Sequence, residues 1–196
     1  MKVFGLTGGT GTGKTTAVGV VEKLGGYAID TDAVYHDLLV SSKSMVSEID
    51  ASFPGVVTDG VLDRKALGAI VFDDEEKLLL LNKITHKFVT DKVAELLSEA
   101  EKKGYPFAAV DGVAILETPI AAMCDRTIAV TAPYEDRLDR IMKRESIGRE
   151  YAALRLSAQK PDSYYEEKCD IVLRNDYSDR ADFEKLCTEV FTELIG

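Results

Sequence analysis

Residues 8–15 read Gly-Gly-Thr-Gly-Thr-Gly-Lys-Thr, and the rest of the chain can be interpreted outward from this stretch. It fits the pattern G-x-x-x-x-G-K-[ST], a glycine-rich loop whose backbone N–H groups surround phosphate oxygens. The apolar run 2–6 before it indicates a short buried strand, and residues 16–24 after it indicate a helix. A strand, this loop and a helix in that order predict a nucleotide-phosphate site rather than a glycine-rich turn with an accidental lysine.

Each residue type in the loop has a physical role. The glycines allow the backbone to approach the phosphates without a Cβ in the way. The following helix directs the positive end of its dipole at the same place. We expect Lys14 to reach the β- and γ-phosphates of ATP and to act in catalysis, and the Thr15 hydroxyl to bind Mg²⁺. The predicted ATP-binding residues here are Gly9, Thr10, Gly11, Thr12, Gly13, Lys14, Thr15 and Thr16.

The composition is that of a globular protein. With 196 residues, 45% hydrophobic and 30% charged, the chain suits one α/β domain. Its net charge of −10 argues against general nucleic-acid binding. It shows no apolar run long enough for a bilayer and no signal peptide, so we expect a cytoplasmic protein without a membrane partner, monomeric or weakly self-associating. The three cysteines are scattered, which favours buried thiols over a metal site or disulfides.

The order of elements predicts a three-layer fold with a central parallel sheet. Further apolar strands are expected at 27–30, 107–111, 127–131 and 171–173, separated by helices. The helical stretches after the second and fourth strands exceed what a simple crossover needs. We interpret them as an acceptor-binding helical region at about 33–103 and a small lid at about 144–168. The core is then about 1–32, 104–143 and 169–196.

Carboxylates follow two of these strands. Asp32 comes just after the second strand, and if that strand lies beside the first, its carboxylate comes near the γ-phosphate. A carboxylate there accepts the proton of an attacking hydroxyl, or helps to hold Mg²⁺. Asp111 ends the strand at 107–111, where it orders Mg²⁺ through water or caps the strand end. We therefore expect Asp32 to be catalytic and Asp111, with Thr15, to serve the metal.

A basic segment lies in an acidic chain. Residues 137–160 hold seven basic and three acidic side chains, a local charge of +4. A solvated helix face gives such a pattern, but a phosphotransferase also needs cations over its nucleotide. Guanidinium groups pair well with phosphate oxygens, and Arg144 is the predicted lid cation for ATP.

The motifs together resemble the dephospho-CoA kinase family, enzymes that transfer the γ-phosphate of ATP to the ribose 3′-hydroxyl of dephospho-CoA in the last step of coenzyme A synthesis. The similarity rests on Phe4 through Thr15, on Ile29-Asp30-Thr31-Asp32 followed by His36, and on segments spread over nearly the whole chain. Those segments are 59–64, 70–72, 81–86 and 111–117, the lid residues Arg144, Arg155, Gln159 and Lys168, and 170–175.

The resemblance implies roles for single residues. It places the catalytic base on Asp32. Arg64 and His86 become candidates for binding the acceptor, although Arg64 also suits a structural ion pair and His86 a buried or capping position. Lys87 and Val113-Ala114 depart from the family pattern near the acceptor pocket. Two alternatives stay open: a P-loop kinase for another small alcohol or nucleoside, and a nucleotide-binding switch protein without transferase activity.

Overall fold

The computed structural model describes residues 1–196, and the chain divides into two compact units. The first unit consists of Met1–Ile29 and Leu97–Gly196, and the second of Asp30–Leu96. The long helix α5 (Glu75–Lys102) contains the second boundary between them. No helix in the chain is both long enough and apolar enough to cross a bilayer. All three cysteines are free thiols; Cys187 is buried as expected, whereas Cys124 and Cys169 are half-buried.

The first unit is built on a five-stranded sheet in the order β2-β5-β1-β6-β7. Its strands are β1 (Lys2–Thr7), β2 (Tyr27–Asp30), β5 (Phe107–Asp111), β6 (Arg126–Thr131) and β7 (Ile171–Arg174). The strand β1 pairs in parallel with β5 and β6, and β6 pairs in parallel with β7. The predicted parallel sheet and α/β class are therefore confirmed.

One expectation about the sheet is wrong, because β2 does not lie beside β1. The strand β5 separates them. Four of the five residues of β5 are fully buried, whereas β2 has one buried residue in four. The more apolar strand thus occupies the inner position, and β2 forms an edge. Periodicity indicates that a segment is a strand but does not reveal its neighbour.

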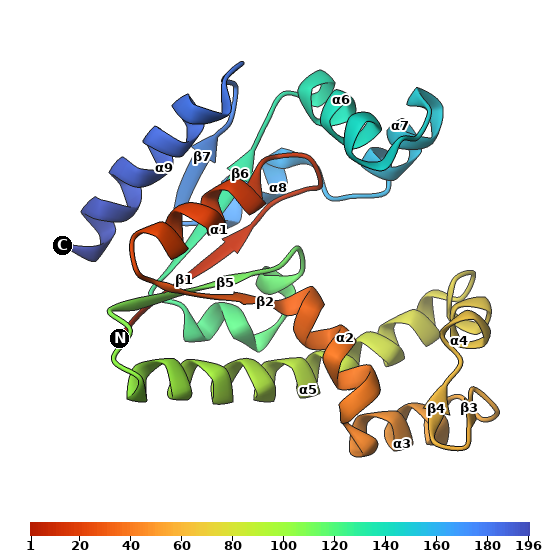
Figure 1. Ribbon diagram of the computed structural model, residues 1–196. Coiled ribbons are helices and arrows are strands. Elements are labelled where there is room, and N and C mark those ends of the chain that lie inside the picture. Colours follow the sequence, from red (N-terminus) through yellow and green to blue (C-terminus); the bar gives the residue numbers. More distant parts are fainter. The chain divides into compact units, whose positions relative to one another are not determined.

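Helices cover both faces of this sheet. On one face, α1 (Lys14–Lys23) packs beside α9 (Arg180–Ile195), as Figure 1 shows in red and blue. Their core holds Phe4 and Leu6 of β1 together with Phe183 and Phe191 of α9. The other face carries the 3₁₀ turns η1 (Ile115–Glu117) and η2 (Pro119–Met123) and the helix α8 (Asp162–Lys168).

The basic segment folds into a helical hairpin within the first unit. The helices α6 (Tyr134–Glu145) and α7 (Arg149–Ser157) pack through Leu138, Ile141, Ala152 and Leu156. Ser146, in the left-handed conformation, ends α6 and allows the chain to reverse. A loop then leads from α7 to α8, so the polar side chains of residues 158–162 stand at a turn between two helices.

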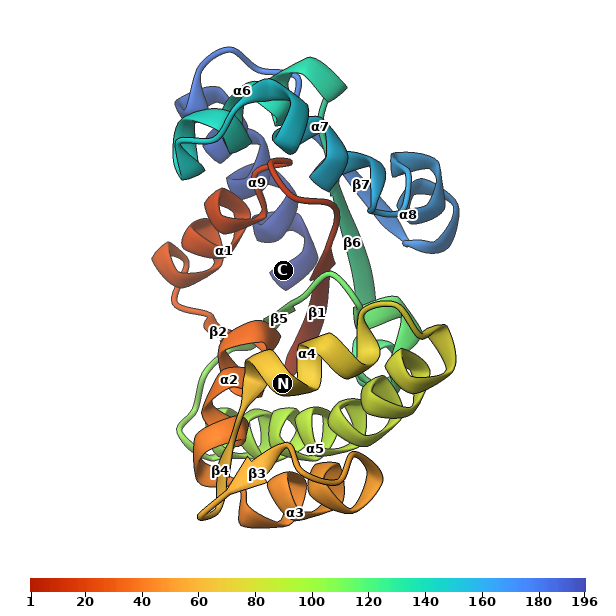
Figure 2. The same ribbon diagram turned by 90° about the vertical axis from the view of Figure 1, so that its right-hand side faces the viewer.

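The second unit has a core of its own. It contains α2 (Thr31–Ser41), α3 (Lys43–Ser52), the strands β3 (Val57–Thr58) and β4 (Val61–Leu62), α4 (Arg64–Val71) and most of α5. Its buried cluster includes Leu39, Met45, Ile49, Leu67 and Ile84, one or two from each helix. Figure 2 shows β4 running beside α2 in this unit.

The β3–β4 hairpin was not expected from the sequence. Its two strands pair antiparallel around the dipeptide Asp59-Gly60. Both turn residues have positive φ angles, 52° and 78°. Asp-Gly is a characteristic sequence of such tight turns, because both positions must enter the left-handed region. The signal was present, but two-residue strands are too short to show an alternating pattern.

Candidate active site

The glycine-rich loop connects β1 to α1 and passes close over neighbouring backbone. Gly8 has a φ of 136°, and a Cβ there would collide with the carbonyl of Val130 in β6. Gly13 has a φ of 108°, and a Cβ there would collide with the amide of Asn175. Both positions therefore need glycine for conformation and for space.

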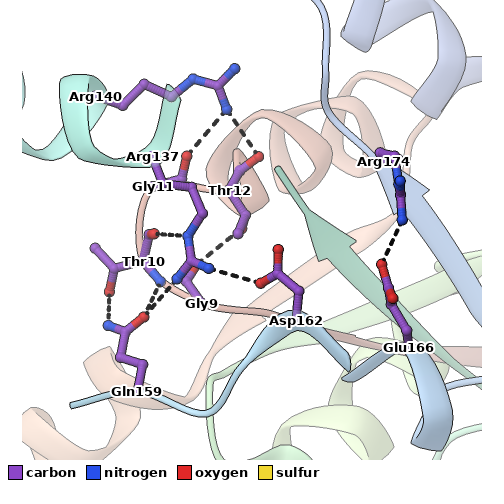
Figure 3. A network of polar contacts seen from close by, with 10 residues as sticks. All are labelled: Gly9, Thr10, Gly11, Thr12, Arg137, Arg140, Gln159, Asp162, Glu166 and Arg174. Carbon is purple, nitrogen blue, oxygen red and sulfur yellow. Dashed lines mark hydrogen bonds and ion pairs between the residues drawn. The ribbon is translucent and has the colours of Figure 1, made fainter. Parts of the chain in front are cut away.

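Two side chains hold the first half of the loop (Figure 3). The Arg137 Nε–H donates to the Thr10 carbonyl at 3.0 Å. Gln159 bonds the same residue twice: its Oε1 accepts from the Thr10 N–H at 2.8 Å, and its Nε2 donates to the Thr10 hydroxyl at 2.6 Å. Residues from α6 and from the loop after α7 therefore fix Thr10.

The second half of the loop is held in a similar way. The Thr12 hydroxyl donates to the Gly9 carbonyl at 2.9 Å. Arg140 Nη1 lies 3.2 Å from the Gly11 carbonyl and 3.4 Å from that of Thr12. Asn175, which is buried after β7, donates to the Thr12 carbonyl at 2.8 Å.

The carbonyl oxygens of all four residues from 9 to 12 thus accept hydrogen bonds from the chain's own side chains. A carbonyl oxygen directed at a phosphate would repel it, because both carry negative charge. With these oxygens engaged by donors within the protein, and with the Thr10 N–H engaged by Gln159, the other N–H groups of the loop and of the start of α1 are the groups suited to meet an anion. These hydrogen bonds turn the loop carbonyl oxygens toward the protein, an arrangement that suits an anion.

Two ion pairs lie close to the loop. Arg137 Nη1 pairs with Asp162 at 2.8 Å, and Arg174 pairs with Glu166 at 2.8 Å (Figure 3). Burial raises the pKa of the Asp162 carboxyl above its ordinary value, although Arg137 acts in the opposite direction. A pocket of about 390 Å³ opens here, lined by residues 131–134, Asp162, Glu166, Arg174 and Asp176.

The predicted catalytic and metal residues of the first unit lie around the loop. Lys14 and Thr15 are the first residues of α1, and the Thr16 N–H donates to the Gly13 carbonyl at 2.9 Å. The parallel register pairs Asp111 with Leu6, two residues before the loop. The half-buried carboxylate of Asp111 therefore lies at the strand end that leads into the loop.

These residues fit a magnesium ion that is held mainly by a nucleotide. No group of three or more His, Cys, Asp or Glu side chains gathers into a metal cage. One hydroxyl and one carboxylate suit Mg²⁺, which usually binds to one or two protein groups and takes phosphate oxygens and water as its other ligands.

Arg144 lies on α6, and its side chain pairs with a neighbouring carboxylate. Its guanidinium pairs with Glu145 at 2.8 Å, and 57% of its side chain is exposed. Glu145 also pairs with Arg155. The arginines that contact the loop, Arg137 and Arg140, belong to the same basic segment but were not selected from the sequence. Arg137 and Arg140 precede Arg144 by seven and four residues, which places all three on one helix face. This spacing is the feature of the sequence from which the two loop-contacting arginines could have been predicted.

Asp32 lies in the second unit, as the second residue of α2. Asp30 caps this helix, because its carboxylate accepts the N–H groups of Asp32 at 2.8 Å and Ala33 at 3.1 Å. The Asp32 side chain is exposed. Since Asp30 serves as the cap, Asp32 is not needed for that structural role.

The second unit also contains a small pocket around Arg64. Its volume is about 170 Å³, and it is lined by Tyr35, Leu62, Arg64, Leu67, Gly68, Val71 and Leu81. Burial raises the pKa of Tyr35, and the nearby charge of Arg64 opposes this rise. A cation and a phenol on apolar walls suit a ligand with both anionic and apolar parts. His86, half-buried on α5, is not among the lining residues, and Tyr35 was not predicted.

The sheet, the glycine-rich loop and the helix that follows it define a class of protein, the P-loop NTPase fold. Comparison with known proteins narrows this class. A family model described as dephospho-CoA kinase (CoaE) matches residues 2–180. The dephospho-CoA kinase of Rhizobium meliloti is 36% identical over 182 residues, which cover 93% of this chain and 92% of that protein. The chain belongs to the dephospho-CoA kinase family.

Solved structures share the fold of this chain. The Thermus thermophilus protein TT1252 has a TM-score of 0.80 and 30% identity, covering 100% of this chain and 98% of that one. Dephospho-CoA kinase from Campylobacter jejuni has a TM-score of 0.62 and 26% identity, covering 98% and 97%.

Proposed function

We propose that this chain binds ATP on its glycine-rich loop and transfers the γ-phosphoryl group to the ribose 3′-hydroxyl of dephospho-CoA, giving coenzyme A and ADP. Membership in the dephospho-CoA kinase family supports the reaction and its two substrates. The observation that supports the donor half most directly is the loop itself, whose carbonyl oxygens at residues 9–12 all accept hydrogen bonds from the protein's own side chains.

On the donor side, the N–H groups of the loop bind the phosphates, and Lys14 neutralises charge that develops on the transferred group. Arg144, whose side chain is exposed, exchanges its partner Glu145 for a phosphate oxygen when ATP is bound. Thr15 and Asp111 hold Mg²⁺, which offsets phosphate charge when it is present.

On the acceptor side, Asp32 accepts the proton of the 3′-hydroxyl as its oxygen attacks phosphorus. Arg64 pairs with an anionic group of the acceptor, and His86 contacts the same substrate. The exposed Arg64 and the pocket that it lines support this assignment, while His86 rests on the family resemblance alone. We further propose a cytoplasmic enzyme, monomeric or weakly self-associating, with no nucleic-acid or membrane partner.

The test is an acceptor panel with the purified protein, ATP and Mg²⁺, with ADP release as the rate and mass spectrometry of the product. We expect rapid turnover with dephospho-CoA, and a product whose added phosphate lies on the ribose 3′-oxygen by NMR. Turnover of another alcohol or nucleoside with none of dephospho-CoA would refute the proposed acceptor. ATP binding without acceptor-stimulated ADP release from any of them would indicate a nucleotide switch instead.

A further inference from the structure

Arg137 is the single Lys, Arg, Asp or Glu residue of this chain that is buried, with 6% of its surface exposed. A buried charge is costly unless it is paired and its donors are satisfied. The proposed reaction gives Arg137 no part, and its ion pair with Asp162 neutralises its charge locally. The ion pair explains how the buried charge is tolerated. It does not explain why an arginine is buried beside the phosphate-binding loop.

The guanidinium directs donors to three residues in two segments, the glycine-rich loop and the turn between α7 and α8. Its Nε bonds the Thr10 carbonyl at 3.0 Å, Nη1 bonds Asp162 at 2.8 Å, and Nη2 bonds Gln159 Oε1 at 3.1 Å. The group also packs directly on the loop, since a Cβ on Gly9 would collide with Nη2. A lysine could not replace it, because an ammonium group is a point donor without this planar fork.

Thr10 is the residue on which these contacts converge. Its carbonyl is held by Arg137, and its N–H and hydroxyl are both held by Gln159. Every polar group of Thr10 is thus bound to one of two side chains that also bind each other. Thr10 lies in the first half of the loop, so its orientation sets the path by which the backbone enters the anion-binding turn.

We propose that Arg137 is a positioning residue for ATP, which together with Gln159 fixes Thr10 and so pre-orders the phosphate-binding loop. The same contacts fasten the segment between α7 and α8 to the loop. Arg137 acts through Thr10 and does not touch the nucleotide. The inference rests on the proposed function only in that the loop binds ATP, and it is independent of the acceptor.

The test separates positioning from stability with two variants. Arg137→Met keeps the length of the side chain but leaves the Asp162 carboxylate without its partner, so we expect a lower Tm and weaker ATP binding. Arg137→Met/Asp162→Asn removes the unpaired charge as well. In this double variant we expect Tm to return to within about 2 °C of wild type. We expect its Kd for a fluorescent ATP analogue, and its KM for ATP, to stay about tenfold higher.

The KM for the acceptor should change less than about twofold in the double variant, since no acceptor contact is altered. Arg180→Gln is the matched control, because it breaks an exposed ion pair with Glu184 far from the loop in sequence, and it should leave both ATP constants unchanged. A double variant that regains wild-type ATP affinity together with its Tm would show that Arg137 is only structural.

A further variant tests the proposal if the arginine variants do not fold. Gln159→Met removes the bonds to the Thr10 N–H and hydroxyl without adding charge, and we expect ATP binding to weaken several-fold. Wild-type ATP affinity in this variant would overturn the proposal. Since these are binding measurements on ATP alone, a wild-type protein that fails to phosphorylate dephospho-CoA would refute the proposed acceptor and leave the role of Arg137 intact.

Discussion

At the scale of single residues, the side chains that shape the loop differ from those that we propose to act on the substrate. Arg137, Gln159 and Asn175 bond loop backbone or Thr10. Lys14 and Asp32 have no such structural role, because Lys14 opens α1 and Asp32 follows the cap of α2. Substitution of Lys14 or Asp32 should therefore change the rate far more than the stability.

Lys14→Ala should lower kcat about 10²- to 10³-fold, because a preorganised cation is lost where charge develops in the transition state. The rate is measured as ADP release with saturating substrates. Lys23→Ala is the control, since Lys23 ends the same helix, pairs with Glu184 and is 65% exposed. Near-normal turnover of Lys14→Ala would refute the assigned role.

Asp32→Asn keeps the shape of the side chain and removes its basicity. We expect kcat to fall at least about 10²-fold, the lower range for acid–base catalysis, with ATP affinity largely kept. Asp37→Asn, an exposed carboxylate on the same helix, should be silent. If kcat of Asp32→Asn held while ATP affinity dropped, Asp32 would be a metal or positioning residue.

At the scale of elements, the sequence located the helices and strands well but did not predict the order of the strands in the sheet. Asp30 caps α2, and α5 spans most of the later part of the helical region that the sequence predicts, because capping and helical periodicity are local properties. The place of β5 between β2 and β1 is a matter of long-range pairing, which no local pattern records.

The pairing of β6 with β7 gives a pH prediction. Asp170, just before β7, accepts the Thr127 N–H at 2.7 Å and its hydroxyl at 2.8 Å. These bonds to the charged form hold the pKa of Asp170 below its ordinary value. A carboxyl with a lowered folded-state pKa contributes stability above its unfolded pKa, and this contribution is lost as the pH falls through the folded pKa.

Asp170→Asn should therefore be less stable than wild type at pH 7, and the difference should shrink below about pH 4. The measurement is the Tm of both proteins between about pH 3 and pH 7, a range that spans the unfolded-state pKa of an aspartate. A difference that stays constant over this range would mean that the charge of Asp170 contributes nothing.

At the scale of the whole molecule, the first unit carries the complete donor loop together with the side chains that hold it. ATP binding to the folded protein should stabilise it by about 2.7 kcal/mol at about one hundred times Kd. For a chain of this size we expect Tm to rise by about 5–10 °C. Differential scanning fluorimetry measures the shift, and Lys14→Ala should reduce it. The absence of any shift in the wild type would contradict the proposed ATP site.

The sequence by itself determined the loop, the α/β class and the family, because each depends on neighbouring residues or on ordered motifs along the chain. Only the tertiary structure decided which distant side chains hold the loop. Arg137 and Gln159 lie 127 and 149 residues beyond Thr10, and their bonds to it exist only after β1, α6 and the segment before α8 have folded together. Hydrogen-bond geometry between remote segments is set by the packing of the folded chain. It cannot be predicted from the composition of the sequence or from the spacing of its residues.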